Sequence, residues 1–322
     1  MATLAMEEWR RVEAAAAALP ASQQPRIGSS SLPLWNKCGT IDMGDASASA
    51  ELATIIDVAR SDPSGAFEVL SGAEIRARWT GLAGVPLEWS GVFNREGGVL
   101  TPDVAVPTLH ALAVASGTTL IDQSPVVGVR EVPCAGRSCE VRLSDGTLLG
   151  ASRVVIAAGA WVAPLLQRAV SPPPCPALAM EVWEISWAWY RLRKDAAAKS
   201  AATALPAWRA FAGAPPGSAG AASAAVAQSG GSSTRIGRGF YGFPVHERSD
   251  AVKIAGHGHS TIGRFSAPEE RAGRPSAAFV AQTSAFAAAT FDKLLEEGGG
   301  EELEPHTCLY VHAARRVMFS LR

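Results

Sequence analysis

The 322-residue sequence is short of cysteine, of charge imbalance and of long apolar runs. Its five cysteines include no Cys-x-x-Cys pair, and none stands at zinc-ligand spacing from a histidine. A disulfide scaffold and a metal site are therefore not expected. The 29 Lys and Arg residues nearly balance the 30 Asp and Glu residues, giving a net charge of −1. Because so small a charge exerts no long-range attraction on polyanions, we expect no nucleic-acid partner and no membrane partner.

Targeting signals and common catalytic motifs are also missing. No apolar run approaches the ~20 residues that cross a bilayer, and the amino-terminal residues lack the charge pattern of a signal peptide. We therefore expect a soluble protein. The last residues do not form a peroxisomal address, which leaves the compartment open. A Gly-x-Ser-x-Gly motif with triad partners, His-Glu-x-x-His and a P-loop are all absent, which argues against hydrolases and nucleotide triphosphatases.

The residues that are present predict a globular α/β protein. Apolar residues make up 48% of the chain, and its length allows about two domains at roughly 150 residues each. Apolar residues at helical spacing predict the helices, and short apolar runs predict the strands. The predicted helices are 4–20, 50–60, 71–79, 102–115 and 276–297, and the predicted strands are 40–44, 118–122, 126–132, 139–143, 147–149, 153–156, 180–193, 251–255 and 307–311.

Three local patterns organise these elements. Ser144-Asp145-Gly146 lies between two short β-rich runs and predicts a hairpin. The unbroken apolar run 153–156 is typical of a strand buried on both faces at the centre of a sheet. Segment 212–233 consists mostly of Ala, Gly, Ser and Pro and predicts a flexible surface insertion.

A few residues stand out as candidates for chemistry. Lys253 interrupts an apolar strand, so its ammonium is either solvated on an exposed face or directed into a site. His257 follows this strand, where a histidine is usually structural. Cys308 beside Tyr310 has the ordinary interpretation of a buried cysteine. The small residues 157–160 allow a backbone to approach a cofactor, although a plain strand-to-helix turn is the more common explanation of such a run.

Six segments, in order along the chain, carry a resemblance to a known family. They are Thr40–Gly44, Gly97–Leu100, Val155–Trp161, Tyr241–Pro244, Val252–His257 and Cys308–Tyr310. With them the sequence resembles the monomeric sarcosine oxidase and pipecolate oxidase family, which are flavin-dependent amine oxidases of the wider D-amino-acid-oxidase-like group. The resemblance covers most of the chain apart from segment 212–233.

The resemblance implies an α/β (α+β) fold with a partial FAD-binding Rossmann-like domain and an antiparallel-sheet substrate domain. It also implies that the family's first βαβ unit, with its Gly-x-Gly-x-x-Gly turn, and the carboxyl-terminal segment that closes the FAD site are missing. We therefore expect the chain as given to be truncated and to bind FAD poorly. The implied parts are a discontinuous substrate and helical part (1–95), the partial FAD domain (96–170), the antiparallel substrate domain (171–306) and the start of a return to the FAD domain (307–322).

The function implied by the resemblance is oxidation of a secondary amine or N-methyl amino acid, of sarcosine or pipecolate type, to an imine. FAD is the implied cofactor, O2 is reduced to H2O2, and the implied protein is a monomer of peroxisomes or cytoplasm. A non-catalytic remnant of this fold, unable to hold FAD, is the alternative. The implied sites are Cys308 as a thioether to the flavin, Lys253 in the reaction with oxygen, His257, Tyr241 and Tyr310 in the substrate pocket, and Val126, Ala158, Gly159 and Trp161 beside the cofactor.

Overall fold

A computed structural model of the chain describes residues 2–24, 32–134, 137–171, 180–211, 239–257, 263–265, 268–275, 277–296 and 302–313. The predicted insertion at 212–233 lies outside these residues. The chain divides into two compact units. The first comprises Met1–Thr119, Ser186–Thr261 and Arg274–His306, and the second comprises Leu120–Ile185, Ile262–Gly273 and Thr307–Arg322.

Helices and strands are mixed along the first unit. Its helices are α1 (Ala2–Ala17), α2 (Ala50–Ser61), α3 (Gly72–Arg78), α4 (Pro102–Ala115), α6 (Ala196–Thr203) and α8 (Ala277–Thr290). Its strands are β1 (Trp35–Asn36), β2 (Thr40–Gly44), β3 (Phe67–Ser71), β4 (Ser90–Asn94), β5 (Val99–Leu100), β11 (Ala207–Phe211), β12 (Gly239–Phe243) and β13 (Ala251–His257). Two long strands, β10 (Met180–Arg191) and β15 (Glu302–Ala313), have residues in both units and pair with each other. None of the helices in the described ranges is long and apolar enough to cross a bilayer.

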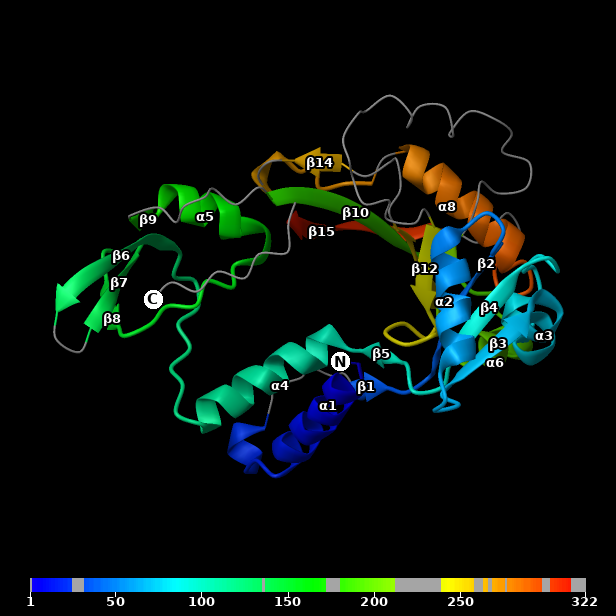
Figure 1. The fold of residues 1–322 in the computed structure, drawn as a ribbon, viewed down its shortest axis with the longest axis horizontal. Coiled ribbons are helices and arrows are strands. Elements are labelled where there is room, and N and C mark those ends of the chain that lie inside the picture. The colour runs from blue at the N-terminus through cyan, green and yellow to red at the C-terminus, as the bar shows by residue number, and fades with distance from the viewer. Residues whose placement is uncertain are drawn as a thin grey trace. The chain divides into compact units, whose positions relative to one another are not determined.

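The main sheet of the first unit has the strand order β10-β13-β12-β11-β2-β4-β3 (Figure 1). Neighbouring strands are antiparallel except β11 and β2, which are parallel. The strands predicted at 40–44, 180–193 and 251–255 are present as β2, β10 and β13. This large mixed sheet together with the helices confirms the predicted α/β (α+β) fold class.

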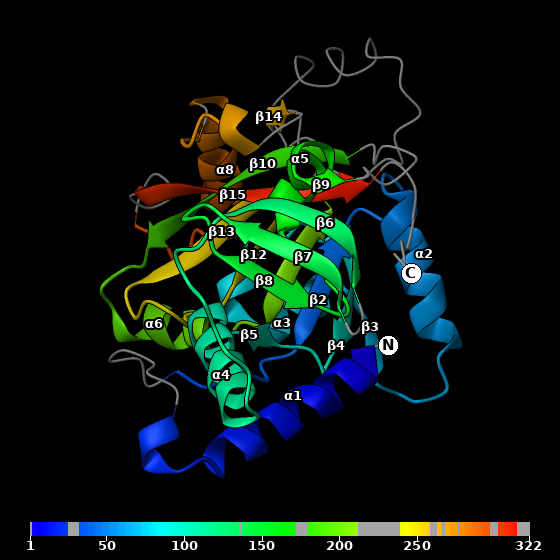
Figure 2. The same ribbon diagram turned by 90° about the vertical axis from the view of Figure 1, so that its left-hand side faces the viewer.

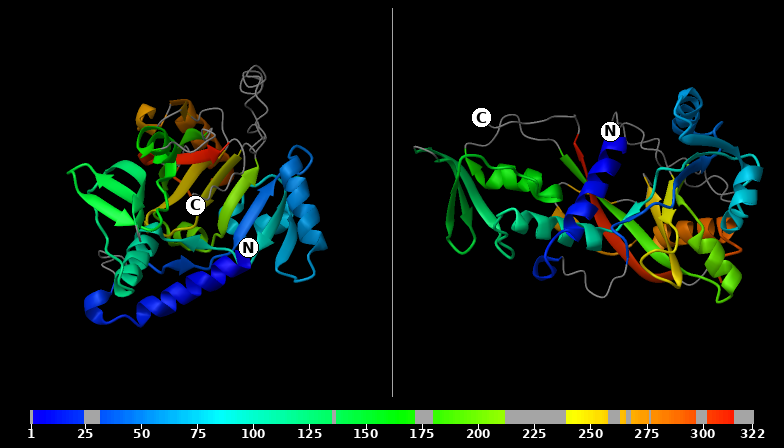
Figure 3. Two further views of the ribbon diagram at one scale, coloured as in Figure 1. Left: turned by 60° about the vertical axis from the view of Figure 1, so that its left-hand side comes forward. Right: turned by 90° about the horizontal axis from the view of Figure 1, so that it is seen from below.

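The two faces of this sheet have different cover, because successive side chains of a strand point to opposite faces. Helix α2 packs through Leu52 and Ile56 against Val92 and Phe211 on the second face. Figure 3 draws this helix in blue beside strands β2 and β3. The part of the second face on β10, β13 and β12 carries the candidate site. The first face carries the main core, which includes Ile41, Met43, Ala188, Tyr190, Trp208, Phe240, Val252 and Ile254 packed with Phe286, Phe291 and Leu294.

Helices α1 and α4 of the first unit pack against each other (Figure 2). Trp9 and Val12 of α1 lie against a small apolar cluster that includes Val104 and Ala105 of α4. Strands β1 and β5 form a two-stranded antiparallel sheet, in which Trp35 pairs with Leu100. This subassembly brings the start of α4 close to the main sheet's β12–β13 connection, as the His246 contacts below show.

The second unit contains a four-stranded sheet in the order β8-β7-β6-β9 (Figure 2). Its elements are β6 (Val126–Cys134), β7 (Arg137–Leu143), β8 (Leu148–Ala151), α5 (Val162–Arg168), β9 (Val170–Ser171) and β14 (Gly263–Phe265). The predicted hairpin is confirmed: Gly146 has a φ of 89°, which favours glycine, and the Asp145 carboxylate accepts from the Thr147 backbone N–H at 2.9 Å.

Two predicted strands are wrong. Residues 118–122 and 153–156 lie outside every strand, and Val155 is 88% exposed. An apolar run forms a strand only where neighbouring strands satisfy its backbone groups and cover its side chains. Neither run pairs with a strand in the described part of the chain.

The helix predicted at 276–297 ends earlier than expected. Helix α8 stops at Thr290, and the chain then turns so that Phe291, Leu294 and Leu295 enter the core. Leu295 forms an isolated antiparallel bridge with Leu192. Burial of these apolar side chains outweighs the helix propensity of the following residues.

Candidate active site

Lys253 lies in the middle of β13, on the second face of the main sheet. Its partners directly across the strands are Trp189 of β10 and Phe243 of β12. The next residue of β13 on the same face, Ala255, lies between Trp187 and Tyr241. Because residues directly opposite each other share a face, three strands place four aromatic side chains around one lysine.

The Lys253 ammonium is held against aromatic rings. Its Nζ lies 3.8 Å from the ring centroid of Trp187, and 5.7 Å from those of Trp189 and Phe243. The side chain is partly buried, and no acidic side chain in the described ranges forms an ion pair with it. The negative faces of the rings attract the cation without neutralising it, so its charge is available to a further group.

The Trp187 indole is itself fixed by two other rings. It stacks on the His306 imidazole with centroids 4.3 Å apart and planes 22° apart. Trp189 meets it edge-on, at 5.9 Å and 88°. These contacts use two more side chains to limit the orientation of the ring that lies against Lys253.

Tyr241 and Arg209 continue this face of the sheet towards β2. Tyr241 packs edge-on against Phe243, with centroids 6.0 Å apart, and lies across from Arg209 of β11. The Arg209 guanidinium binds both oxygens of Asp42, at 2.8 and 3.2 Å, and reaches Glu51 at 3.3 Å. Since two carboxylates already engage Arg209, Lys253 is the cation on this face with its charge still available among the described residues.

One further predicted site residue, His257, lies in the first unit, and the structure describes its backbone position. His257 is the last residue of β13 and pairs with Gly239 of β12. The structure therefore brings Lys253 and Tyr241 to one face and puts His257 four residues beyond Lys253 on the same strand.

The remaining predicted residues lie in the second unit. Cys308 and Tyr310 are alternate, partly buried residues of β15, and the Cys308 sulfur is a thiol. Val126 is the first residue of β6 and is partly exposed. Residues 158–161 form the turn described next.

The turn at residues 158–161 has the open backbone that a cofactor contact requires. Ala158 precedes a short 3-10 helix that begins at Gly159. Gly159 has a φ of 53°, and nothing lies within 4 Å of the position that a Cβ would occupy. Trp161 is 47% exposed, and its Nε1 donates to Glu269 at 3.1 Å. The positive φ favours glycine at this position.

Sequence reasoning missed His246, which joins the loop after β12 to the start of α4. Thr101 stands at the N-cap position of α4, but its hydroxyl donates to the Pro33 carbonyl at 2.7 Å rather than capping the helix. A hydroxyl has one proton, so the His246 Nε2, 2.7 Å away, donates to Thr101. The Asn36 amide nitrogen approaches the His246 Nδ1 at 3.5 Å, which makes Nδ1 the acceptor.

These contacts fit a neutral imidazole that carries its proton on Nε2. Burial lowers the pKa of His246, and the nearby Glu247 carboxylate opposes this shift in part. The signal for this residue was absent from the local sequence because Asn36 and Thr101 are 210 and 145 residues away from it.

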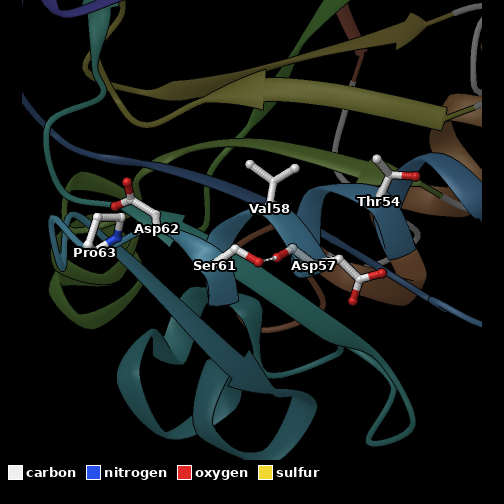
Figure 4. A pocket seen from close by; sticks show the side chains of 6 residues that line it. All are labelled: Thr54, Asp57, Val58, Ser61, Asp62 and Pro63. Carbon is white, nitrogen blue, oxygen red and sulfur yellow. Dashed lines mark hydrogen bonds between the residues drawn. The ribbon is translucent and has the colours of Figure 1, made fainter.

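One hollow of the described surface carries none of the predicted residues. It has a volume of about 500 Å³ and lies along the end of α2, lined by Thr54, Asp57, Val58, Ser61, Asp62 and Pro63 (Figure 4). The Ser61 hydroxyl donates to the Asp57 backbone carbonyl at 2.8 Å, an ordinary contact within a helix. We assign no chemistry to it.

Comparison with known proteins identifies relatives over much of the chain. The family model described as FAD dependent oxidoreductase matches residues 1–203. A monomeric sarcosine oxidase of Arthrobacter sp. is 25% identical over 135 residues, or 42% of this chain and 33% of the relative. An N-methyl-L-tryptophan oxidase of Citrobacter koseri is 27% identical over 254 residues, or 78% of this chain and 55% of the relative. The matched part of this chain thus spans about a third of the length of the sarcosine oxidase and about half of the length of the N-methyl-L-tryptophan oxidase.

A solved structure shares the fold. NikD, described as an unusual amino acid oxidase essential for nikkomycin biosynthesis, aligns with a TM-score of 0.64 at 20% identity. The alignment covers 94% of this chain and 64% of NikD. At this identity the likeness shows the fold alone.

Proposed function

Since the chain belongs to the FAD dependent oxidoreductase family, we propose that it serves the oxidation of an amine or amino acid. The finer proposal is a secondary amine or N-methyl amino acid as substrate. The names of its relatives, sarcosine oxidase and N-methyl-L-tryptophan oxidase, support this class of substrate. The observation that carries the proposal is the Lys253 ammonium, held on an aromatic face with no ion-pair partner in the described part of the chain.

The proposed reaction converts an amine and O2 into an imine and H2O2. The amine loses one hydrogen from carbon and one from nitrogen, which leaves a C=N double bond. The two electrons and two protons that these hydrogens carry reduce O2 to H2O2, so the equation balances without a further reagent. FAD, when bound, supplies the electron-transfer chemistry that side chains lack.

The residues present fit a flavin cofactor. Gly159 leaves open space beside its backbone in the second unit, and Cys308 offers a partly buried thiol there. We propose that Gly159 and Ala158 approach the cofactor, that Val126 and Trp161 lie along it, and that the Cys308 sulfur holds it covalently. We further propose that residues 96–170 belong to its binding domain.

In the first unit we propose three roles for side chains. Lys253 provides a fixed positive charge that stabilises negative charge developing on oxygen as it is reduced. Tyr241 and His257 line the substrate pocket. The apolar rings around Lys253 limit access of water, which strengthens the electrostatic effect of the ammonium.

The test is a comparison of the two half-reactions. Lys253→Met should slow reoxidation by O2 far more than reduction by sarcosine, pipecolate or N-methyl-L-tryptophan, because the positive charge acts on oxygen. Lys199→Met, which changes an exposed lysine of α6, is the matched control and should alter neither rate. Stopped-flow absorbance of the flavin measures both, on the longest product of the gene. Equal slowing of both half-reactions would contradict the role given to Lys253.

A further inference from the structure

The ring closest to Lys253 is not the one directly opposite it. Trp189 pairs with Lys253 across β10 and β13, yet its ring centroid is 5.7 Å from Nζ. Trp187, the diagonal neighbour, pairs with Ala255 and lies 3.8 Å away. The small Ala255 side chain leaves the space that the indole and the lysine share. Diagonal pairs of this kind are within reach of long and aromatic side chains.

An aromatic partner has a different effect on the ammonium from a carboxylate. A lysine side chain has roughly 2 kcal/mol of rotamer entropy, so it needs a partner to stay in one place. A carboxylate partner would also order the lysine side chain, but its negative charge would cancel the field of the ammonium beyond the ion pair. An indole attracts the ammonium through its quadrupole and carries no net charge. The Trp187 contact therefore orders Lys253 and leaves its full positive charge on the face.

The orientation of Trp187 is in turn set by two other rings, one from β15 and one from its own strand. His306 of β15 stacks on it at 4.3 Å, and Trp189 meets its edge at 5.9 Å. A ring held at two contacts gives the ammonium a defined position, whereas a lone indole on a strand could turn about its side-chain bonds.

We propose that Trp187 is a positioning residue for Lys253: it holds the ammonium in place by a cation–π contact, and stacking on His306 holds its indole in place. The inference rests on the proposed function for the use of the charge, but the contact itself belongs to the protein without cofactor. Trp189 and Phe243 complete the surrounding rings and contribute less, because they lie 5.7 Å away.

The lysine NMR signals of the chain test the contact directly. The sequence has five lysines, Lys37, Lys194, Lys199, Lys253 and Lys293. Biosynthetic ¹³C-lysine labelling gives one set of Cε–Hε signals for each, and Lys253→Met assigns the set of interest. We expect the Lys253 Hε signals to be displaced upfield by the indole ring current. Trp187→Leu should abolish the displacement, Trp187→Phe should keep part of it, and Trp189→Leu should keep most of it.

The outcome can contradict the inference even if one variant does not fold. Trp187→Phe preserves an aromatic ring, and far-UV circular dichroism of each variant reports on folding. Undisplaced Lys253 signals in the parent, a Trp187→Phe spectrum identical to that of the parent, or a larger loss with Trp189→Leu would each overturn the role of Trp187.

Kinetics separate this inference from the proposed function. In the flavin-loaded protein, Trp187→Leu should slow the oxygen half-reaction about 2- to 30-fold, the range of cation–π strengths, and Trp187→Phe should restore most of the rate. If Lys253→Met slows reoxidation and Trp187→Leu does not, the positioning role is wrong and the proposed function stands. If neither variant changes reoxidation while the NMR displacement is present, the contact is real and the function proposed for Lys253 is wrong.

Discussion

At the scale of single residues, Lys253 and Lys37 show how the partner of a lysine decides what its charge does. Lys37 lies 2.7 Å from the Glu96 carboxylate on the surface, so each charge screens the other. Lys253 has aromatic partners, which leave its field intact. The ammonium can therefore act on a bound group in a way that Lys37 cannot.

Two cysteines make a similar contrast. Burial raises the pKa of the Cys38 thiol in the first unit, so Cys38 is a poor nucleophile at neutral pH. Cys308 belongs to β15 in the second unit and is the residue we propose to bind flavin.

The covalent assignment predicts how flavin behaves on denaturation. Acid precipitation of the flavin-loaded parent should leave the flavin with the protein pellet, and Cys308→Ala should release it to the supernatant. Absorbance of the two fractions measures the distribution. Cys38→Ala is the matched control and should behave as the parent does. Flavin released from the parent itself would show that the link does not exist.

The lowered pKa of His246 predicts that the folded protein loses stability in acid. Its pKa is lowered by burial, so the unfolded chain binds a proton on this residue at a higher pH than the folded chain does. Its stabilising effect is therefore complete above the unfolded pKa of about 6.5 and is lost as the pH falls through the folded value. Protonation of Nδ1 would also place a donor against the Asn36 amide donor.

The measurement is the urea midpoint between pH 7.5 and 5 for the parent and His246→Phe. The parent should lose stability over this interval, and the variant should show a flatter profile. His110→Gln, at an exposed position of α4, should keep the profile of the parent. A parent profile that rises towards pH 5 would contradict the role of His246.

At the scale of elements, the starts of α2 and α3 follow the capping rules of the sequence. Ser71 and Glu74 form a capping box at the start of α3, in which each side chain accepts from the other residue's backbone N–H. Ser49 begins α2 in the same way and accepts from the Leu52 N–H at 3.2 Å. Helix α2 matters for the site because it covers one part of the face that carries Lys253 and Arg209.

The Ser49 cap predicts a measurable loss. Ser49→Ala should lower the free energy of unfolding by about 1 kcal/mol, because the Leu52 N–H loses its side-chain acceptor. Ser49→Asp keeps an acceptor at the helix N-terminus and should stay close to the parent. Urea unfolding followed by circular dichroism measures both. Equal losses in the two variants would mean that the acceptor is not what stabilises α2.

At the scale of the whole molecule, the exposed apolar side chains of the second unit stand apart from its small core. Leu120, Ile121 and Val155 are exposed there, in runs that the sequence pattern assigns to strands. A buried strand needs partners on both edges. These runs have the residue types of strands, but the described structure gives them no neighbouring strand to pair with.

The exposure of Val155 predicts that a charged residue is tolerated at this position. In the described structure Val155→Asp replaces an 88% exposed side chain, so the free energy of unfolding should change by less than about 0.5 kcal/mol. Ile185→Ala, at a fully buried position of the same unit, should cost about 2–5 kcal/mol. Urea titrations of the chain as given compare the two. A Val155→Asp loss as large as that of Ile185→Ala would show that residue 155 is buried in a sheet.

Local patterns predicted much of this fold. The helices at 50–60 and 102–115, the hairpin at Ser144-Asp145-Gly146 and the Ser71 capping box could all be predicted because each depends on hydrogen bonds or apolar spacing within a few residues. Lys253 also stands out in the sequence because it interrupts an apolar strand, and its role in a site stays a prediction. The family could also be predicted, and the family model that matches residues 1–203 confirms it.

The contacts that define the candidate site were decided by tertiary structure. The pairing of β10 with β13 brings Trp187 to Lys253, and the turn after β12 brings His246 to Thr101. Both join residues more than sixty positions apart, and a shift of one residue in strand register would move every side chain to the other face. No local pattern carries that register, because it results from packing the whole sheet against its core.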